Sequence, residues 1–347
     1  MRKFRNRIIL LIGIGLTLAF GDTPFAAAQK SPRSTTVGTN PPGTVFYAVG
    51  SGLAKVISGA APFQATVQPY TGSSTFLPLL DGGEIDFGVV NSVETGLAYQ
   101  GPNRLKVGGK NPLPHAPNTR LLMRGSALMT SMVARKEGPV KTIYDVKGKR
   151  ATGEYPAHAA VWISNFGAMA TGGFSWEDVK VVPVPAVNEG IDALIQGRAD
   201  VSHHAIGSAK IKEADAAVGV RFVSLDCSAQ GQERVRKAVP GYYLTTLKSG
   251  FSTGIVGDTC VLTFDIYFLG HKALPANVVQ TTLKALWDDV DKLSPLHPQF
   301  KDWTRERAVS ADVTIAYHPA AVQFYKEKGI WSPKADEAQK SLLALNP

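Results

Sequence analysis

Two segments of the chain, one in each half, show the same succession of elements. The first covers residues 67–90 and the second covers residues 179–201. Each has an extended run, a loop of small or capping residues, a short amphipathic helix, a glycine stop, and an aspartate that leads a new extended run. Such strand–loop–helix–strand units build parallel α/β sheets, whose ligands lie beyond the carboxyl ends of the strands. Two units predict two similar lobes with a ligand cleft between them.

The loops within these units indicate where the helices begin and end. Ser73 or Ser74 and Asn188 are natural N-caps, because their side chains accept hydrogen bonds from free helix amides. The glycine pair 82–83 and Gly197 sit where a helix ends in a left-handed turn.

Two aspartates hold matched positions in the two units. Asp86 and Asp200 each stand just before the second extended run. Their equivalence favours bracing of the adjacent loops over paired acid–base chemistry.

The first 28 residues have the features of a secretory signal peptide: a basic start, an apolar stretch at residues 8–20 and small residues at 26–28. The apolar stretch is shorter than the roughly 20 residues that span a bilayer. We therefore expect cleavage after Ala28 and a periplasmic mature protein, with an uncleaved anchor as the alternative. Cleavage removes four basic residues and one acid and lowers the net charge from +9 to +6. This modest, dispersed charge argues against a nucleic-acid partner.

A mature chain of about 320 residues fits two domains. We expect a flexible leader at residues 29–43, because it is polar and rich in proline. Lobe 1 is expected to comprise residues 44–138 and 260–347, and lobe 2 residues 139–259. Hinge strands near the two junctions would connect them.

Three further predictions concern secondary structure. Residues 44–50 are predicted to form a buried strand, because the glycines at 50 and 52 break the apolar run before a short helix at 53–58. Residues 101–119 contain four prolines and are predicted to be irregular. A loosely packed tail is predicted after a helix at 320–328.

Two cysteines remain, Cys227 and Cys260. An oxidising compartment allows a disulfide, but the sequence gives no distance between them, and two separate thiols are equally compatible. Cysteine and histidine spacings of the zinc type do not occur. We therefore expect neither a metal nor another cofactor.

Four motifs follow one another along nearly the whole mature chain: residues 72–74 with 81–92, residues 144–150, residues 178–182 with 193–200, and residues 317–331. Together they resemble the TAXI solute-binding proteins of TRAP (tripartite ATP-independent periplasmic) transporters.

This resemblance implies a two-lobed periplasmic-binding-protein fold of type II, each lobe a mostly parallel sheet flanked by helices. It also implies a monomeric receptor, not an enzyme, that closes on a small organic acid or amino acid and delivers it to an ion-gradient-driven TRAP permease. The chain departs from the family pattern at residues 153–159, where many relatives carry a Ser-Gly-Thr-like loop, and this leaves the ligand open. The alternatives are a receptor of the same fold that serves an ATP-driven importer or a membrane sensor and, more distantly, a hydrolase.

The candidate ligand residues of lobe 1 lie at a helix start and a strand end. The loop 72–75 would offer backbone amides and a helix dipole to a carboxylate, although plain capping is also possible. Asn91 and Ser92 end a strand at the predicted cleft, and Tyr47 would form a wall of the cleft or pack within the strand. Arg124 would pair with a carboxylate or remain solvated.

The candidates of lobe 2 lie in the divergent loop and after the second unit. Tyr155 and His158 belong to that loop. His203 and His204 follow the second strand as Asn91 and Ser92 follow the first, and alternation predicts that at most one of these histidines faces the ligand. The predicted ligand-binding residues are therefore Tyr47, Gly72, Ser73, Ser74, Thr75, Asn91, Ser92, Arg124, Tyr155, His158, Asn188 and His203.

Overall fold

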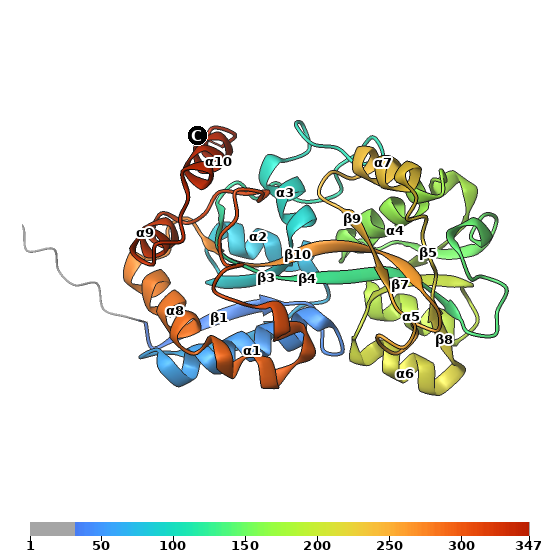
Figure 1. Cartoon of the computed structure of the whole chain (residues 1–347), viewed down its shortest axis with the longest axis horizontal. Coiled ribbons are helices and arrows are strands. Elements are labelled where there is room, and N and C mark those ends of the chain that lie inside the picture. The colour runs from blue at the N-terminus through green and yellow to red at the C-terminus, as the bar shows by residue number, and fades with distance from the viewer. Residues whose placement is uncertain (1–31, 347) are drawn as a thin grey trace, which may run out of the picture. The chain divides into compact units, whose positions relative to one another are not determined.

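A computed structural model describes residues 32–346, and the expected signal peptide lies outside them. Its central feature, within those residues, is a ten-stranded sheet with the main order β2-β1-β3-β10-β4-β7-β5-β6, to which β8 adds beside β4 and β9 beside β10 (Figure 1). The strands are β1 (Ser34–Thr39), β2 (Gln64–Pro69), β3 (Phe87–Asn91), β4 (Thr119–Arg135), β5 (Arg150–Glu154), β6 (Lys180–Val184), β7 (Val201–Ala205), β8 (Val220–Phe222), β9 (Tyr243–Leu247) and β10 (Thr259–His271).

Two long strands, β4 and β10, connect the two halves of the sheet. They pair antiparallel with each other. β10 also pairs antiparallel with β3, and β4 pairs antiparallel with β7 and β8. The outer strands are parallel in both halves, with β1 between β2 and β3 and β5 between β6 and β7. We call the half built on β1–β3 lobe 1 and the half built on β5–β8 lobe 2. The predicted two-lobed α/β fold is confirmed.

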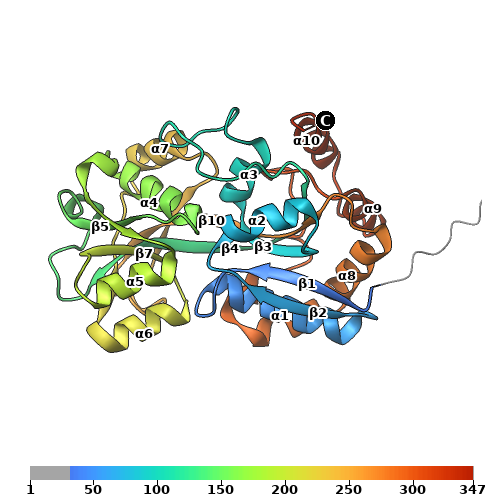
Figure 2. The same cartoon turned by 180° about the vertical axis from the view of Figure 1, so that it is seen from behind.

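Helices cover both faces of the sheet in each lobe. In lobe 1, α2 and α3 lie on one face and α1 and α8 on the other, and in lobe 2, α4 and α7 lie opposite α5 and α6 (Figures 1 and 2). No helix in the described part of the chain is long and apolar enough to span a bilayer. The helices are α1 (Val45–Ala60), α2 (Ser73–Gly82), α3 (Ser92–Gln100), α4 (Ala159–Thr171), α5 (Val187–Ile195), α6 (Ala209–Val218), α7 (Ala229–Ala238), α8 (Ala276–Asp288), α9 (Pro319–Glu327) and α10 (Pro333–Leu343).

The aspartates of the two sequence units make equivalent hydrogen bonds to the neighbouring strand. The carboxylate of Asp86, just before β3, accepts a hydrogen bond of 2.8 Å from the backbone N–H of Thr36 in β1. Asp200, just before β7, accepts one of 2.9 Å from the N–H of Arg150 in β5. Each aspartate therefore ties the start of its strand to the start of the neighbouring parallel strand. The bracing interpretation is confirmed.

The helix ends within the units agree with the prediction, but the helix starts do not. Gly83 and Gly197 have φ values of 76° and 72°, the left-handed conformation expected after a helix. The N-caps are Gly72 for α2 and Ala186 for α5, and neither makes a side-chain capping bond. The serines and Asn188 lie one or two residues inside the helices, where their side chains are free to make longer-range contacts.

The start of lobe 1 differs from the prediction. Residues 34–39, expected in a flexible leader, form β1, whose β-branched Thr and Val side chains suit a strand. Residues 44–50, expected as a strand, belong to α1, which begins where the Thr44 hydroxyl accepts a bond from the N–H of Tyr47. The glycine at 50 is not a break, because a Cβ there would lie 2.2 Å from Thr39 Cγ2. It lets α1 pack closely on β1.

The end of the chain also differs from the prediction. The expected loose tail forms α10, which has one buried side chain, Ala335, and therefore no apolar stripe to reveal it. Hydrogen bonds hold it in place instead: the Tyr99 hydroxyl donates to the carbonyl of Leu342 at 3.0 Å, and Gln339 Oε1 accepts from the N–H of Tyr317 at 2.8 Å. Residues 101–118 contain neither helix nor extended strand, as predicted.

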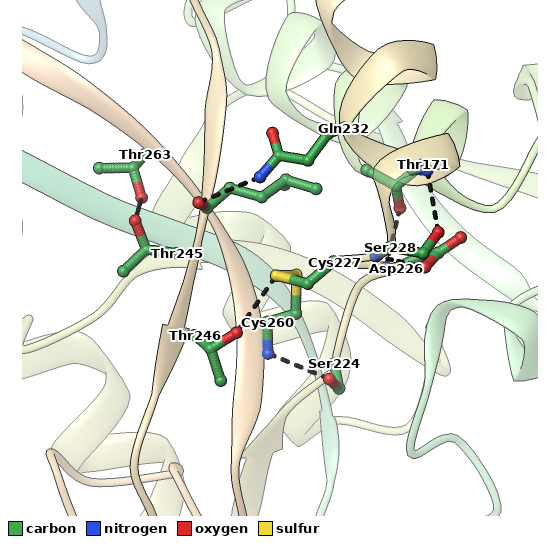
Figure 3. The surroundings of a disulfide bond; sticks show 12 residues. Thr171, Ser224, Asp226, Cys227, Ser228, Gln232, Thr245, Thr246, Cys260 and Thr263 are labelled. Carbon is green, nitrogen blue, oxygen red and sulfur yellow. Dashed lines mark hydrogen bonds between the residues drawn. A yellow bond between two sulfur atoms is a disulfide. The ribbon is translucent and has the colours of Figure 1, made fainter.

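The two cysteines form a disulfide in lobe 2 (Figure 3). Cys227 lies in the segment between β8 and α7, and Cys260 lies near the start of β10. The Ser224 hydroxyl oxygen accepts a bond of 3.1 Å from the N–H of Cys260, and the Thr246 hydroxyl lies 3.4 Å from Cys227 Sγ. The bond therefore fastens a peripheral segment of lobe 2 to a strand that runs through both lobes.

Candidate ligand-binding site between the lobes

A cavity of about 50 Å³ lies where the two lobes and the long strands meet. Its walls come from lobe 1 (Asn40, Thr44, Val45, Phe46, Asn91, Glu94), from lobe 2 (His158, Ala160, Val161, Ser164, Val187, His203, His204, Ala205) and from β4 and β10 (Leu128, Thr130, Phe264). Asn91, His158 and His203 were predicted as ligand residues, and the structure brings them together here.

The cavity walls carry no lysine or arginine among the described residues. Burial lowers the pKa of His158 and His203 to about 3 and that of His204 to about 4, so all three imidazoles are neutral at pH 7. Burial raises the pKa of the Glu94 carboxyl to about 8, against the opposing effect of a hydrogen bond from Ser73. The walls at neutral pH therefore offer mostly neutral donors and acceptors.

His158 and Asn40 meet across the lobe interface. Asn40 Nδ2 lies 3.3 Å from His158 Nε2, so the amide donates and the imidazole carries its hydrogen on Nδ1. Asn40 Oδ1 and His158 Nδ1 have no hydrogen-bond partner among the described residues, and both side chains are buried. Buried polar atoms of this kind are costly unless paired. Asn40 thus offers one free acceptor, and His158 one free donor, to a solute in the cavity.

A strained turn positions His158. Glu154 and Tyr155, at the end of β5, have φ values of 66° and 50°, the left-handed conformation that non-glycine residues rarely adopt. Strain of this kind persists where the surroundings enforce it, often at functional sites. Here the buried hydroxyl of Tyr155 bonds to that of Thr152, which fixes the turn from within lobe 2.

The two adjacent histidines at the end of β7 point to opposite faces of the sheet. His203 Nδ1 lies 3.0 Å from Asn165 Oδ1 of α4, whereas His204 Nε2 lies 3.3 Å from Asn188 Oδ1 of α5. Both nevertheless line the cavity, because the cavity covers the end of the strand and not one face of it. The predicted alternation is thus observed, and which of the two histidines contacts a solute stays a prediction.

Glu94 is the principal wall residue that sequence reasoning missed. Asn91 caps α3, with its Oδ1 accepting from the N–H groups of Val93 (2.7 Å) and Glu94 (3.2 Å). The carboxyl of Glu94, third in the helix, accepts a hydrogen bond from the Ser73 hydroxyl. In the sequence it resembles any acidic residue that stabilises a first helical turn. The signal was its position, one turn after a buried strand that ends at the cleft.

The predicted loop 72–75 contacts lobe 2 and does not line the cavity. Ser74 Oγ accepts a bond of 3.0 Å from the N–H of Ala159. A Cβ on Gly72 would lie 2.2 Å from the carbonyl oxygen of Ala157. The Thr75 hydroxyl donates back to the Gly72 carbonyl at 2.6 Å. The loop is thus a contact surface for the closed lobes.

Asn188 also joins the lobes. Besides its bond to His204, its Nδ2 donates to the carbonyl of Pro42 at 3.1 Å. Nearby, the N–H of Lys210 in α6 donates to the carbonyl of Gly43 at 3.2 Å. The segment between β1 and α1 therefore rests on lobe 2.

The remaining predicted residues lie outside the cavity walls. Tyr47 sits in the first turn of α1, and Tyr155 is internal to lobe 2. Ser92 Oγ accepts from the N–H of Asp265 at 3.2 Å, and Arg124 pairs with the carboxylate of Asp265 at 2.6 Å. Arg124 is therefore half-buried and paired with an acid of β10 in this structure.

No group of three or more His, Cys, Asp or Glu side chains in residues 32–346 is arranged to hold a metal ion. The clustered histidines of the cavity act here as hydrogen-bonding groups.

Two lobes, a sheet that passes between them and a cavity at their junction, with a few polar groups among apolar walls, define a periplasmic solute-binding protein. A family model described as NMT1-like matches residues 37–329, and the chain belongs to the NMT1-like family. This confirms the resemblance to TAXI-type solute-binding proteins, which are receptors and not enzymes.

One solved structure supports the fold, and two others are similar at lower scores. A structure described as a periplasmic transporter aligns with a TM-score of 0.52 at 12% identity, over 90% of this chain and 97% of the other. The periplasmic aliphatic sulphonate binding protein SsuA from Escherichia coli aligns at 0.45 and 14% identity, over 91% and 84%. An ancestral arginine-binding protein bound to arginine aligns at 0.46 and 14%, over 78% and 99%. The fold assignment depends on the first of these.

Proposed function

We propose that this receptor binds a small organic acid or amino acid in the cavity between its lobes and delivers it to the membrane subunits of a TRAP permease. The observation that carries the proposal is the composition of the cavity wall. Asn40, Asn91 and His158 present polar groups from both lobes around about 50 Å³, between apolar walls. A cavity of that size fits a solute of only a few non-hydrogen atoms.

Closure would follow from the placement of the polar groups. Lobe 1 and lobe 2 both supply residues to the wall, so a solute contacts both only when they are together. The long strands β4 and β10 are the covalent connection, and their pairing shifts register between Asp265 and Tyr267, where they pass from one lobe to the other. Hinge closure commonly uses a few residues at such points. This crossing lies within the residues expected for lobe 1, so lobe 1 gains β1 and the end of β4 and the start of β10 go with lobe 2.

Binding is tested by a thermal-shift screen and calorimetry with acetate, glycolate, L-lactate, pyruvate, glycine and L-alanine. A solute at about 100 times its dissociation constant adds about 2.7 kcal/mol to stability. Ala160→Leu places three carbons into the cavity and should abolish binding, whereas Ala216→Leu, on the exposed face of α6, should not. Binding that survives Ala160→Leu would place the site elsewhere.

Delivery is tested by uptake into vesicles that carry the TRAP permease subunits. We expect uptake that depends on the receptor and on an ion gradient without ATP. An ATP requirement would favour an ATP-driven importer of the same receptor class.

A further inference from the structure

Each ring nitrogen of His203 faces a hydrogen-bond acceptor, and a neutral imidazole can donate to only one of them. Its Nε2 lies 2.7 Å from the hydroxyl oxygen of Thr130, and that hydroxyl donates its own hydrogen to the carbonyl of His204 at 2.8 Å. The Thr130 oxygen must then accept from His203 Nε2. On the other side, Nδ1 faces Asn165 Oδ1 at 3.0 Å, while Asn165 Nδ2 donates to the carbonyl of Thr152 at 3.2 Å.

A neutral imidazole carries one N–H, and an imidazolium carries two. With His203 neutral and its hydrogen on Nδ1, where Asn165 Oδ1 accepts it, Thr130 must turn its hydrogen from the His204 carbonyl to Nε2, which leaves that carbonyl without the hydroxyl. With His203 protonated, every bond of the network is made. The Thr130 hydroxyl therefore has two hydrogen-bonding orientations, one for each protonation state of His203. His203 itself lines the solute cavity.

The charges around His203 decide which state prevails. His204 on the same strand and His158 at the start of α4 both disfavour a second positive charge nearby. Lys210 of α6 faces His204, and its own charge is paired with Asp192 and Glu213 at 2.7 Å each. Glu94 on α3, the titratable acid of the wall, is protonated at neutral pH, and Tyr155 and Tyr242 stay neutral. Burial without a counter-charge thus keeps His203 neutral in the empty site.

A bound carboxylate supplies the missing negative charge. Since the described cavity wall offers no lysine or arginine, a buried anion has no fixed cation to pair with, which is costly in a low dielectric. A proton on His203 neutralises it and at the same time completes the network of Thr130 and Asn165. We propose that this receptor takes up one proton on His203 when it binds a small carboxylate, so that its affinity for anionic solutes rises as the pH falls.

This inference depends on the proposed function, because it requires an acid as the solute. The experiment uses the tightest-binding acid from the six solutes named above and titrates it into the mature protein between pH 5.5 and 7. At these pH values such acids are already ionised and Glu94 stays protonated, so neither group contributes to the number of protons taken up on binding. Calorimetry in PIPES and in Bis-Tris, which differ in ionisation enthalpy, gives the number of protons taken up.

We expect an uptake close to one proton and an affinity that rises roughly tenfold for each unit that the pH is lowered. Thr130→Val keeps the side-chain shape but removes the acceptor, so both the proton count and the affinity at pH 6 should fall. Asn165→Asp supplies a carboxylate that protonates His203 beforehand, so the count should approach zero and the affinity should lose its pH dependence. The control is Thr282→Val in α8, where a buried hydroxyl has no partner among the described residues, and it should leave the count at one.

Nitrogen NMR of histidine-labelled wild-type protein tests the assignment without any substitution in the network. One imidazole should change from singly to doubly protonated as the acid saturates, and this signal should be absent in His203→Gln. Binding of an acid with no proton uptake would overturn this inference and leave the proposed function standing. Protonation of His158 or His204 instead would also overturn it. If none of the acids binds, the proposed function fails and this inference fails with it.

Discussion

The Ser74 side chain in lobe 1 accepts a hydrogen bond of 3.0 Å from the backbone N–H of Ala159, the first residue of α4 in lobe 2. The residue at the N-cap of α4 itself, His158, makes no capping bond with its side chain. Ser74 therefore caps a helix of the opposite lobe. The free amide of α4 gains this partner only when the two lobes are closed, which makes Ser74 part of the closure and not of the solute contact.

Ser74→Ala should weaken the binding of every solute by the same factor. A lost capping bond costs about 0.5–2 kcal/mol, which corresponds to roughly 2- to 30-fold in affinity. Calorimetry on several acids measures this, and Ser332→Ala is the matched control, because Ser332 caps α10 away from the interface (3.2 Å to the N–H of Ala335). A change in the order of preference among the acids would mean that Ser74 contacts the solute directly.

Gly72→Ala should hold the lobes apart. Its φ of −176° is extended backbone open to any residue, so lobe 1 should fold normally. The added Cβ would meet the Ala157 carbonyl oxygen at 2.2 Å and His158 Cβ at 2.6 Å in the closed form. Overpacking typically costs about 1–3 kcal/mol, or roughly 5- to 150-fold in affinity.

Solution scattering should show that Gly72→Ala keeps a larger radius of gyration when solute is added. Gly59→Ala in α1, where a Cβ meets nothing within 4 Å, should close like the wild type. Equal compaction of both variants would show that the loop 72–75 does not touch lobe 2 in the closed state.

Local patterns in the sequence predicted much of the fold. The glycine stops were predictable because each acts at the end of its own helix. Asp86 and Asp200 were predictable because they hold matched positions in the two units, although their partners, Thr36 and Arg150, lie outside those units. The helix break predicted at Gly50 was wrong. The glycine is there because of its close contact with Thr39 on β1, and it does not end its own helix. The length of β10 likewise depends on partners in both lobes, β3, β4 and β9, which no local pattern contains.

The cavity was less predictable than the fold. Asn91, His158 and His203 were predicted because they follow strands or lie in the divergent loop. Asn40 was missed because it stands in a segment that the composition describes as a leader. Which polar residues face a cavity depends on how two lobes close, and that information lies in contacts such as Ser74 with Ala159, which no local pattern contains.

The disulfide should contribute to the stability of the mature protein. Cys227 and Cys260 are separated by 33 residues, and removing a native disulfide typically costs about 2–5 kcal/mol, in part by freeing the unfolded chain. The double variant Cys227→Ser with Cys260→Ser should show a lower urea midpoint. Reducing agent should lower the wild-type midpoint to nearly the same value and leave the variant unchanged. A wild-type midpoint that is insensitive to reduction would contradict the bond.

Glu94→Gln should change how stability depends on pH. Burial raises the pKa of Glu94 to about 8 in the folded protein, against an ordinary value of 4.5. Between these values the folded state holds a proton that the unfolded state releases, so the free energy of unfolding falls as the pH rises, by up to about 1.4 kcal/mol per unit, and levels off above pH 8. Glutamine has no such proton, and its Oε1 can still accept from the Ser73 hydroxyl. The variant should therefore gain stability relative to the wild type from pH 5 to pH 8.

Urea unfolding of the wild type and Glu94→Gln at pH 5, 6, 7 and 8 measures this gain. The lowered pKa values of the cavity histidines act in the opposite direction, because their stability contribution is complete above about pH 6.5 and is lost as the pH falls. Both proteins share that contribution, so it cancels in the difference between them. Glu337→Gln, at an exposed position of α10, should run parallel to the wild type. If Glu94→Gln also runs parallel, the carboxyl is ionised throughout, and the cavity carries a fixed negative charge that would exclude the acids proposed here as solutes.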